Sequence, residues 1–130
     1  MNQLPLWIKR LYGWAGAYGV VALIPNYFME TRFGVDHPPA ITHPEFYYGF
    51  TGVGLAWQVA FFIIAKDPIR YRAIMVPAML EKVTFALAVA WLLTQSRVPS
   101  LYVGAAAADL LLASAFLAAF LKTPSNERPV

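Results

Sequence analysis

The sequence contains no cysteine and little charge. Only 13% of its 130 residues are Asp, Glu, Lys or Arg, whereas soluble domains average about 25%. The lack of cysteine excludes disulfides, thiolate metal sites and thiol redox chemistry. Few charges combined with 59% hydrophobic residues argue against an ordinary soluble domain and predict a membrane protein.

The hydrophobic residues are grouped into four runs of 19 to 24 residues that together occupy most of the chain. A helix needs about 20 residues to cross the hydrocarbon core of a bilayer, and backbone in lipid must satisfy its own hydrogen bonds. We therefore predict an all-α protein, a polytopic membrane four-helix bundle with a single domain. The predicted spans cover residues 11–29, 46–65, 70–95 and 98–121, and residues 30–45 form the long loop.

The basic residues predict how this bundle is oriented. Arg32 and Arg97 lie on one predicted side, and seven lie on the other: Lys9, Arg10, Lys66, Arg70, Arg72, Lys122 and Arg128. By the positive-inside rule both termini are cytoplasmic. The net charge of +3 is then a topology signal and does not indicate nucleic-acid binding. We expect a multi-pass protein of the cell inner (plasma) membrane, surrounded by membrane lipids.

The 30–45 loop carries side chains that could bind a divalent metal ion: Asp36, His37, His43 and Glu45. Carboxylate and imidazole groups are suitable ligands. The alternative is structural, because Thr42-His43-Pro44-Glu45 has the T-x-x-E form of a capping box with proline in the first turn. In that case these residues would begin the second span.

Glu81 and Lys82 are adjacent in the third predicted span. Each costs about 2.5 to 3.5 kcal/mol at a bilayer centre, so such residues usually face the protein interior. At 1.5 Å per residue, Glu81 lies about 12 Å beyond Ala73, close to the expected depth of Gln58 in the second span. Proline at position 77 predicts a bend one turn before the glutamate.

These depths predict a candidate ligand-binding cluster around Glu81. Its expected members are Glu81, Gln58, Tyr18, Trp57 and Asp109. On the second span, a polar or small stripe at helical spacing should face the other helices. That stripe comprises Tyr47, Thr51, Gly54 and Gln58. Gln58 would then meet Glu81, and the cluster could equally be structural hydrogen bonding between helices.

Lys82 points about 100° away from Glu81 around the helix. Because its side chain leans toward the helix N-terminus, we expect it to extend to the cytoplasmic headgroups. The alternative is an interior ion pair with Asp109, although an antiparallel fold about Arg97-Val98 places Asp109 opposite Ala86.

The glycines of the first span recur every three positions, at Gly13, Gly16 and Gly19. Small residues at this spacing allow a neighbouring helix to approach the backbone closely. They predict a packing groove, or else a gap for a planar ligand.

The chain resembles the DoxX-like families of small bacterial four-helix inner-membrane proteins in three features. These are the four short-linked spans, the basic turn AKDPIRYR after the second span and the acidic Glu81 in the third. This resemblance implies an inner-membrane bundle and, in some members, association with a larger complex. It implies no catalytic residues.

Two functional hypotheses follow. The first is a non-enzymatic accessory subunit of a larger membrane complex, or a homo-oligomer, in which the glycine face of the first span and the alanine-rich fourth span contact neighbouring chains. The second is a binder or enzyme for a lipid-like or hydrophobic small molecule, held at Glu81 in the membrane. The sequence leans against an enzyme and indicates no particular cofactor.

Overall fold

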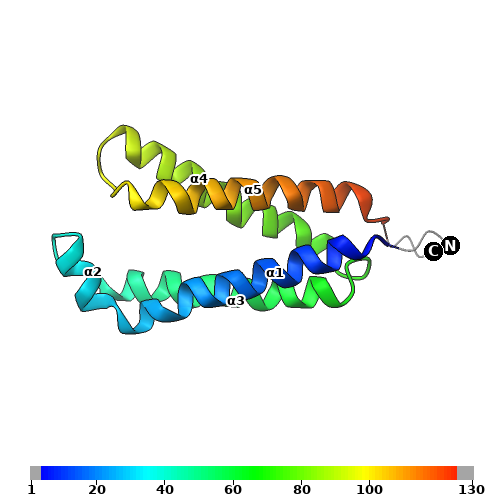
Figure 1. Cartoon of the computed structure of the whole chain (residues 1–130), viewed down its shortest axis with the longest axis horizontal. Coiled ribbons are helices and arrows are strands. Elements are labelled where there is room, and N and C mark those ends of the chain that lie inside the picture. Colours follow the sequence, from blue (N-terminus) through cyan, green and yellow to red (C-terminus); the bar gives the residue numbers. More distant parts are fainter. Residues whose placement is uncertain (1–3, 126–130) are drawn as a thin grey trace.

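The computed structural model describes residues 4–125 and is built from helices (Figure 1). Short 3-10 segments, η1 and η2, precede or follow the long helices, and within the described residues there is no β-strand. In chain order the elements are α1 (Leu6–Leu23), η1 (Ile24–Phe28), α2 (Glu30–Asp36), α3 (Pro44–Lys66), η2 (Arg72–Ile74), α4 (Met75–Thr94) and α5 (Leu101–Lys122).

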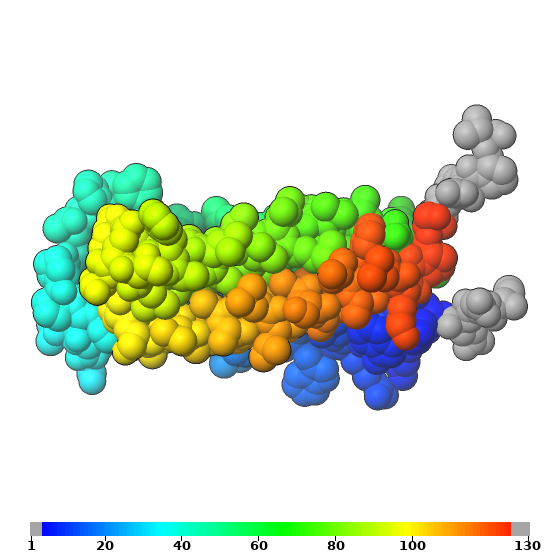
Figure 2. Space-filling model, turned by 90° about the horizontal axis from the view of Figure 1, so that it is seen from above, coloured from blue at the N-terminus to red at the C-terminus, as the bar shows by residue number. Residues whose placement is uncertain are grey.

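The long helices form two antiparallel pairs, α1 with α3 and α4 with α5. Figure 2 shows α4 and α5 side by side on one face of the molecule, with α2 at one end. The beginning of α1, the α3–α4 link and the end of α5 lie together at the opposite end (Figure 1). This end carries Lys9, Lys66, Arg72 and Lys122, and we refer to it as the basic end.

Three helical segments are long and apolar enough to cross a membrane: Pro44–Lys66, Arg72–Thr94 and Leu101–Lys122. They correspond to the second, third and fourth predicted spans. The prediction for residues 11–29 needs correction, because α1 begins five residues earlier, at Leu6, and ends at Leu23. It therefore includes Lys9 and Arg10, which lower its mean hydropathy, and the chain continues as 3-10 helix.

The main core lies toward the basic end and joins the two helix pairs. The ring of Tyr12 stacks on Phe116 with centroids 4.3 Å apart, and Phe61 meets Phe116 edge-on at 5.2 Å. The buried set contains Ile8, Tyr12, Ala15, Phe61, Ile64, Met75, Ala78, Phe116 and Ala119. A smaller cluster between α4 and α5 contains Ala86, Val89 and Ala106. Several alanines of α5 therefore pack within this chain.

Glycines allow α1 and α3 to pack closely. A Cβ added at Gly16 would lie 2.9 Å from Phe62 Cε1, and one at Gly54 would lie 2.8 Å from Leu23 Cδ1. A Cβ at Gly19 would overlap the carboxamide of Gln58. Gly16 and Gly19 thus form the packing groove predicted from their spacing, and α3 fills it.

Arg72 connects the α3–α4 link to the end of α5. Its Nε donates to the carbonyl of Thr123 at 2.7 Å and its Nη2 to that of Phe120 at 3.4 Å. The guanidinium carbon also lies 3.8 Å from the centroid of the Phe120 ring. A cation at a helix C-terminus satisfies carbonyls that have no partner within the helix and favours the helix dipole.

We expect Arg72→Gln to lower the free energy of unfolding by about 2 kcal/mol, because hydrogen bonds from a charged donor contribute about 1.5–3 kcal/mol. Denaturant unfolding in detergent micelles, followed by circular dichroism, measures this loss. Arg70→Gln is the control, because Arg70 is exposed. Equal stability of the two variants would contradict the role assigned to Arg72.

The two predicted helix starts differ from the structure. α3 begins at Pro44 with His43 as the N-cap and with no side-chain capping hydrogen bond, so the capping box predicted at Thr42 does not form in this described segment. The third span is predicted to start at residue 70, whereas α4 starts at Met75. Asp67 lies in the turn before it, where its Oδ1 accepts from the amide of Arg70 at 3.1 Å.

Pro77 consequently lies in the first turn of α4. There proline is tolerated, because its missing N–H would have no helical partner. The proline predicted to bend the third span before Glu81 therefore stands at the start of α4 and not within it. The expected loop 30–45 also contains a helix, α2.

Candidate functional site

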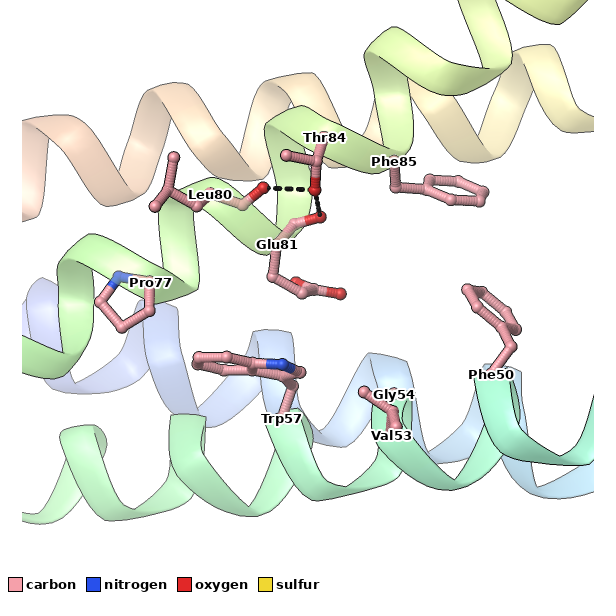
Figure 3. Close-up of a pocket in the computed structure, with 9 residues that line it drawn as sticks. All are labelled: Phe50, Val53, Gly54, Trp57, Pro77, Leu80, Glu81, Thr84 and Phe85. Atoms are coloured by element: carbon pink, nitrogen blue, oxygen red, sulfur yellow. Dashed lines mark hydrogen bonds between the residues drawn. The ribbon is translucent and has the colours of Figure 1, made fainter. Parts of the chain in front are cut away.

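A groove of about 530 Å³ lies between α3 and α4. Its volume falls within the usual range for sites that bind small molecules, about 300–1,000 Å³. Most of its lining is apolar or aromatic, and Glu81 is the one ionisable residue in it (Figure 3). The lining consists of Phe50, Val53, Gly54, Trp57, Pro77, Leu80, Glu81, Thr84 and Phe85.

The carboxylate of Glu81 projects from α4 into the groove (Figure 3). The indole of Trp57 extends from α3 toward Pro77 and Glu81, while Phe50 and Phe85 bound the groove from α3 and α4. The two phenyl rings are 5.9 Å apart and nearly parallel. An acidic group is thus surrounded by aromatic walls.

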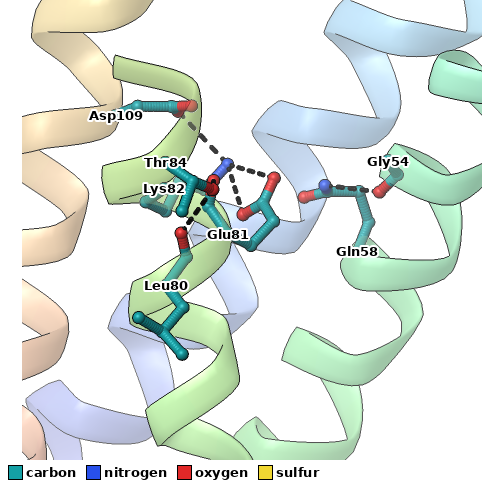
Figure 4. Close-up of polar contacts among 7 residues, drawn as sticks. All are labelled: Gly54, Gln58, Leu80, Glu81, Lys82, Thr84 and Asp109. Carbon is teal, nitrogen blue, oxygen red and sulfur yellow. Dashed lines mark hydrogen bonds and ion pairs between the residues drawn. The ribbon is translucent and has the colours of Figure 1, made fainter. Parts of the chain in front are cut away.

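Glu81 also belongs to a triad with the buried Lys82 and the half-buried Asp109 (Figure 4). The Nζ atom of Lys82 is 3.2 Å from Asp109 Oδ1 and 3.2 Å from Glu81 Oε2. It is also 3.5 Å from Glu81 Oε1, and of the two glutamate contacts only this one has hydrogen-bond geometry. The triad links α4 to α5 through charge.

The expectation that Lys82 extends to the headgroups is wrong. Only 6% of Lys82 is exposed, and its Nζ lies 5.5 Å from the centroid of the Phe61 ring. Two carboxylates attract the ammonium inward, and its long side chain covers the offset of about one turn between Lys82 and Asp109. The alternative, the interior ion pair, is what the structure contains.

Gln58 faces α1. It is 2% exposed, its Nε2 donates to the carbonyl of Gly54 at 2.8 Å, and its Oε1 is packed against Gly19. Within the described chain Oε1 accepts no hydrogen bond. The part of the predicted stripe that includes Gly54 and Gln58 therefore packs on α1.

The groove instead uses the next face of α3, through Phe50, Val53 and Trp57. Sequence reasoning named Trp57 and missed the other two. Their positions at intervals of three and four are the helical signal that could have identified this face. On α4 the lining contains Pro77, Glu81 and Thr84, which share one helical face.

Tyr18 lies away from this site, with 51% of the residue exposed. Of the five predicted ligand-binding residues, the structure brings Glu81 and Trp57 together in the groove. Asp109 is connected to Glu81 through Lys82, while Gln58 is buried against α1 and Tyr18 is exposed on α1.

The structure does not gather the candidate metal ligands into a site. His43 Nδ1 is 3.2 Å from Glu45 Oε1, and Asp36 pairs with Arg32 at 2.9 Å. Across residues 4–125, no group of three or more His, Cys, Asp or Glu side chains is placed to hold a metal ion. The metal-site hypothesis for His37 and its neighbours stays a prediction from the sequence.

No protein-family model, curated protein or solved structure matches the chain.

Proposed function

We propose that this is a multi-pass membrane protein that binds a hydrophobic small molecule in the groove between α3 and α4 and does not catalyse its conversion. The observation that carries this proposal is an aromatic groove of about 530 Å³ with Glu81 in its wall. Apolar pockets with few, well-placed polar groups are typical of ligand sites. The class of ligand is lipid-like, with an apolar body and a hydrogen-bond donor that meets Glu81.

In this proposal α1 and η1 together form a fourth span, Leu6–Phe28, and the protein is a four-helix bundle. The concentration of basic side chains at the basic end supports a cytoplasmic location for both termini, by the positive-inside rule. The inner membrane and the relation to DoxX-like proteins remain predictions from the sequence.

The groove can be tested with a photoreactive long-chain alcohol that carries a diazirine on its chain. In lipid nanodiscs, we expect saturable labelling of residues 50–57 and 77–85, mapped by mass spectrometry and competed by excess unlabelled dodecanol. Thr84→Phe, which places a ring in the groove, should reduce labelling about tenfold, a loss of about 1.4 kcal/mol in binding.

Leu87→Phe is the matched control, because it makes a similar change on an exposed position of α4 away from the groove lining. It should leave labelling unchanged. Labelling that does not saturate, or that is spread evenly over all lipid-facing helices, would overturn the binding proposal.

Association with other chains is the second candidate function. A Cβ added at Gly13 in α1 or Gly104 in α5 would meet nothing within 4 Å among the described residues. Small residues with open space beside them can admit a neighbouring helix. Native mass spectrometry from mild detergent tests for a homo-oligomer or a larger complex, and a monomer without partners would count against it.

A further inference from the structure

The triad of Glu81, Lys82 and Asp109 contains unequal numbers of opposite charges. Glu81 and Asp109 carry two negative charges when ionised, and Lys82 supplies one positive charge. Asp109 contacts Lys82 from α5, whereas Glu81 contacts it from the groove side (Figure 4). The excess negative charge is therefore accessible from the groove, through the carboxylate of Glu81.

The neutral donors near Glu81 bond to backbone carbonyls and do not donate to its carboxylate. The hydroxyl of Thr84 donates to the backbone carbonyls of Leu80 and Glu81, at 2.7 and 3.3 Å. The amide of Gln58 donates to the carbonyl of Gly54. Among residues 4–125, Lys82 is thus the sole side-chain donor to Glu81, although a carboxylate can accept several hydrogen bonds.

The walls of the groove also suit positive charge. Trp57, Phe50 and Phe85 all line it, and the faces of aromatic rings attract cations. In an apolar setting an uncompensated charge is costly. A ligand that neutralises the charge of Glu81 should therefore bind more tightly than a neutral ligand of the same shape.

From this charge balance we infer that the groove selects a lipophilic cation: a molecule with an apolar body and one protonated amine, whose N–H group meets Glu81 while its body packs between Trp57, Phe50 and Phe85. This inference rests on the proposed function and specifies its ligand class. It requires no movement of Lys82, because Asp109 holds the ammonium on the far side of Glu81.

The test uses a matched pair of photoreactive probes that share one diazirine-bearing alkyl chain, one ending in a primary amine and the other in a hydroxyl. Both are titrated into nanodisc-embedded protein, with concentrations expressed per membrane lipid to remove differences in partitioning. We expect the amine to half-saturate the groove residues at a concentration at least about tenfold lower than the alcohol.

Glu81→Gln should bring the ratio of the two half-saturation concentrations, alcohol to amine, close to one. Labelling by the alcohol should persist, which shows that the groove is intact. Asp109→Asn should also reduce the ratio, because Lys82 then compensates Glu81 alone. Glu45→Gln, which removes an exposed carboxylate at the start of α3, outside the groove lining, should leave the ratio of the two half-saturation concentrations unchanged.

The outcomes separate the two proposals. Equal half-saturation by amine and alcohol would overturn the cation preference and leave hydrophobic binding in place. A tenfold preference that survives in Glu81→Gln would also overturn it, since the charge would then act elsewhere. Failure of both probes to label the groove would overturn the proposed function together with this inference.

Discussion

Lys82→Met is expected to produce the largest loss of stability of any single substitution in α4. The substitution removes the ammonium from between Glu81 and Asp109, which are 3.2 Å away on either side. Both carboxylates then lack their counter-charge in a largely apolar setting. Removing one partner of a buried ion pair typically costs about 3–5 kcal/mol, and we expect a loss of that size in the free energy of unfolding.

Reversible unfolding in mixed micelles, or steric trapping in nanodiscs, provides the measurement. Lys66→Met is the control, since Lys66 is exposed at the end of α3 and its replacement should change stability by less than about 0.5 kcal/mol.

The triple variant Glu81→Gln, Lys82→Met, Asp109→Asn separates charge from packing. Replacing all members of a buried ion network by neutral groups is often close to neutral, so this variant should recover most of the loss. A Lys82→Met protein within about 1 kcal/mol of the wild type would show that the carboxylates are not a charged pair facing the lysine.

Gly19→Ala should be the most destabilising of the glycine substitutions. A methyl group there would overlap Gln58, whose amide is held by the carbonyl of Gly54 and is enclosed between α1 and α3. Overpacking of a closed interface costs about 1–3 kcal/mol. The helical preference of alanine over glycine, about 1 kcal/mol, offsets only part of this cost.

Gly49→Ala makes the same change on α3 where an added Cβ would meet nothing within 4 Å in the described chain. It should be neutral or slightly stabilising. In the double variant Gly19→Ala, Gln58→Ala, the methyl group enters space that the amide has left. The two changes should therefore be less costly together than the sum of the single losses, and strict additivity would refute the contact.

The sequence was sufficient to predict the helical class and the approximate limits of three helices. Long apolar runs bounded by charge or proline carry that information, as for α3, which extends one or two residues beyond the predicted 46–65 at each end. The first span was less accurate, because the apolar run was counted from Leu11 although a helix can include Lys9 and Arg10 near a membrane surface.

The site was predicted only in part, since helical spacing defines stripes but not which neighbour each stripe meets. Residues on both stripes of α3 have the right period. Gln58 meets α1, whereas Phe50 and Trp57 face α4, and this choice depends on the packing of all the helices. The direction of Lys82 was missed for a related reason: the lean of its side chain toward the helix N-terminus was given more weight than the attraction of two carboxylates, one of them on another helix.

The uneven distribution of the core has a mechanical consequence. The two helix pairs are held together mainly at the basic end, where Tyr12 stacks on Phe116, and farther along they meet through sparse ring contacts such as Phe50 with Phe85. The two helix pairs are therefore connected most firmly at one end of the molecule. A rotation of a few degrees about that joint would change the width at the Phe50–Phe85 gap far more than near Tyr12, so the aperture responds to small adjustments in the core.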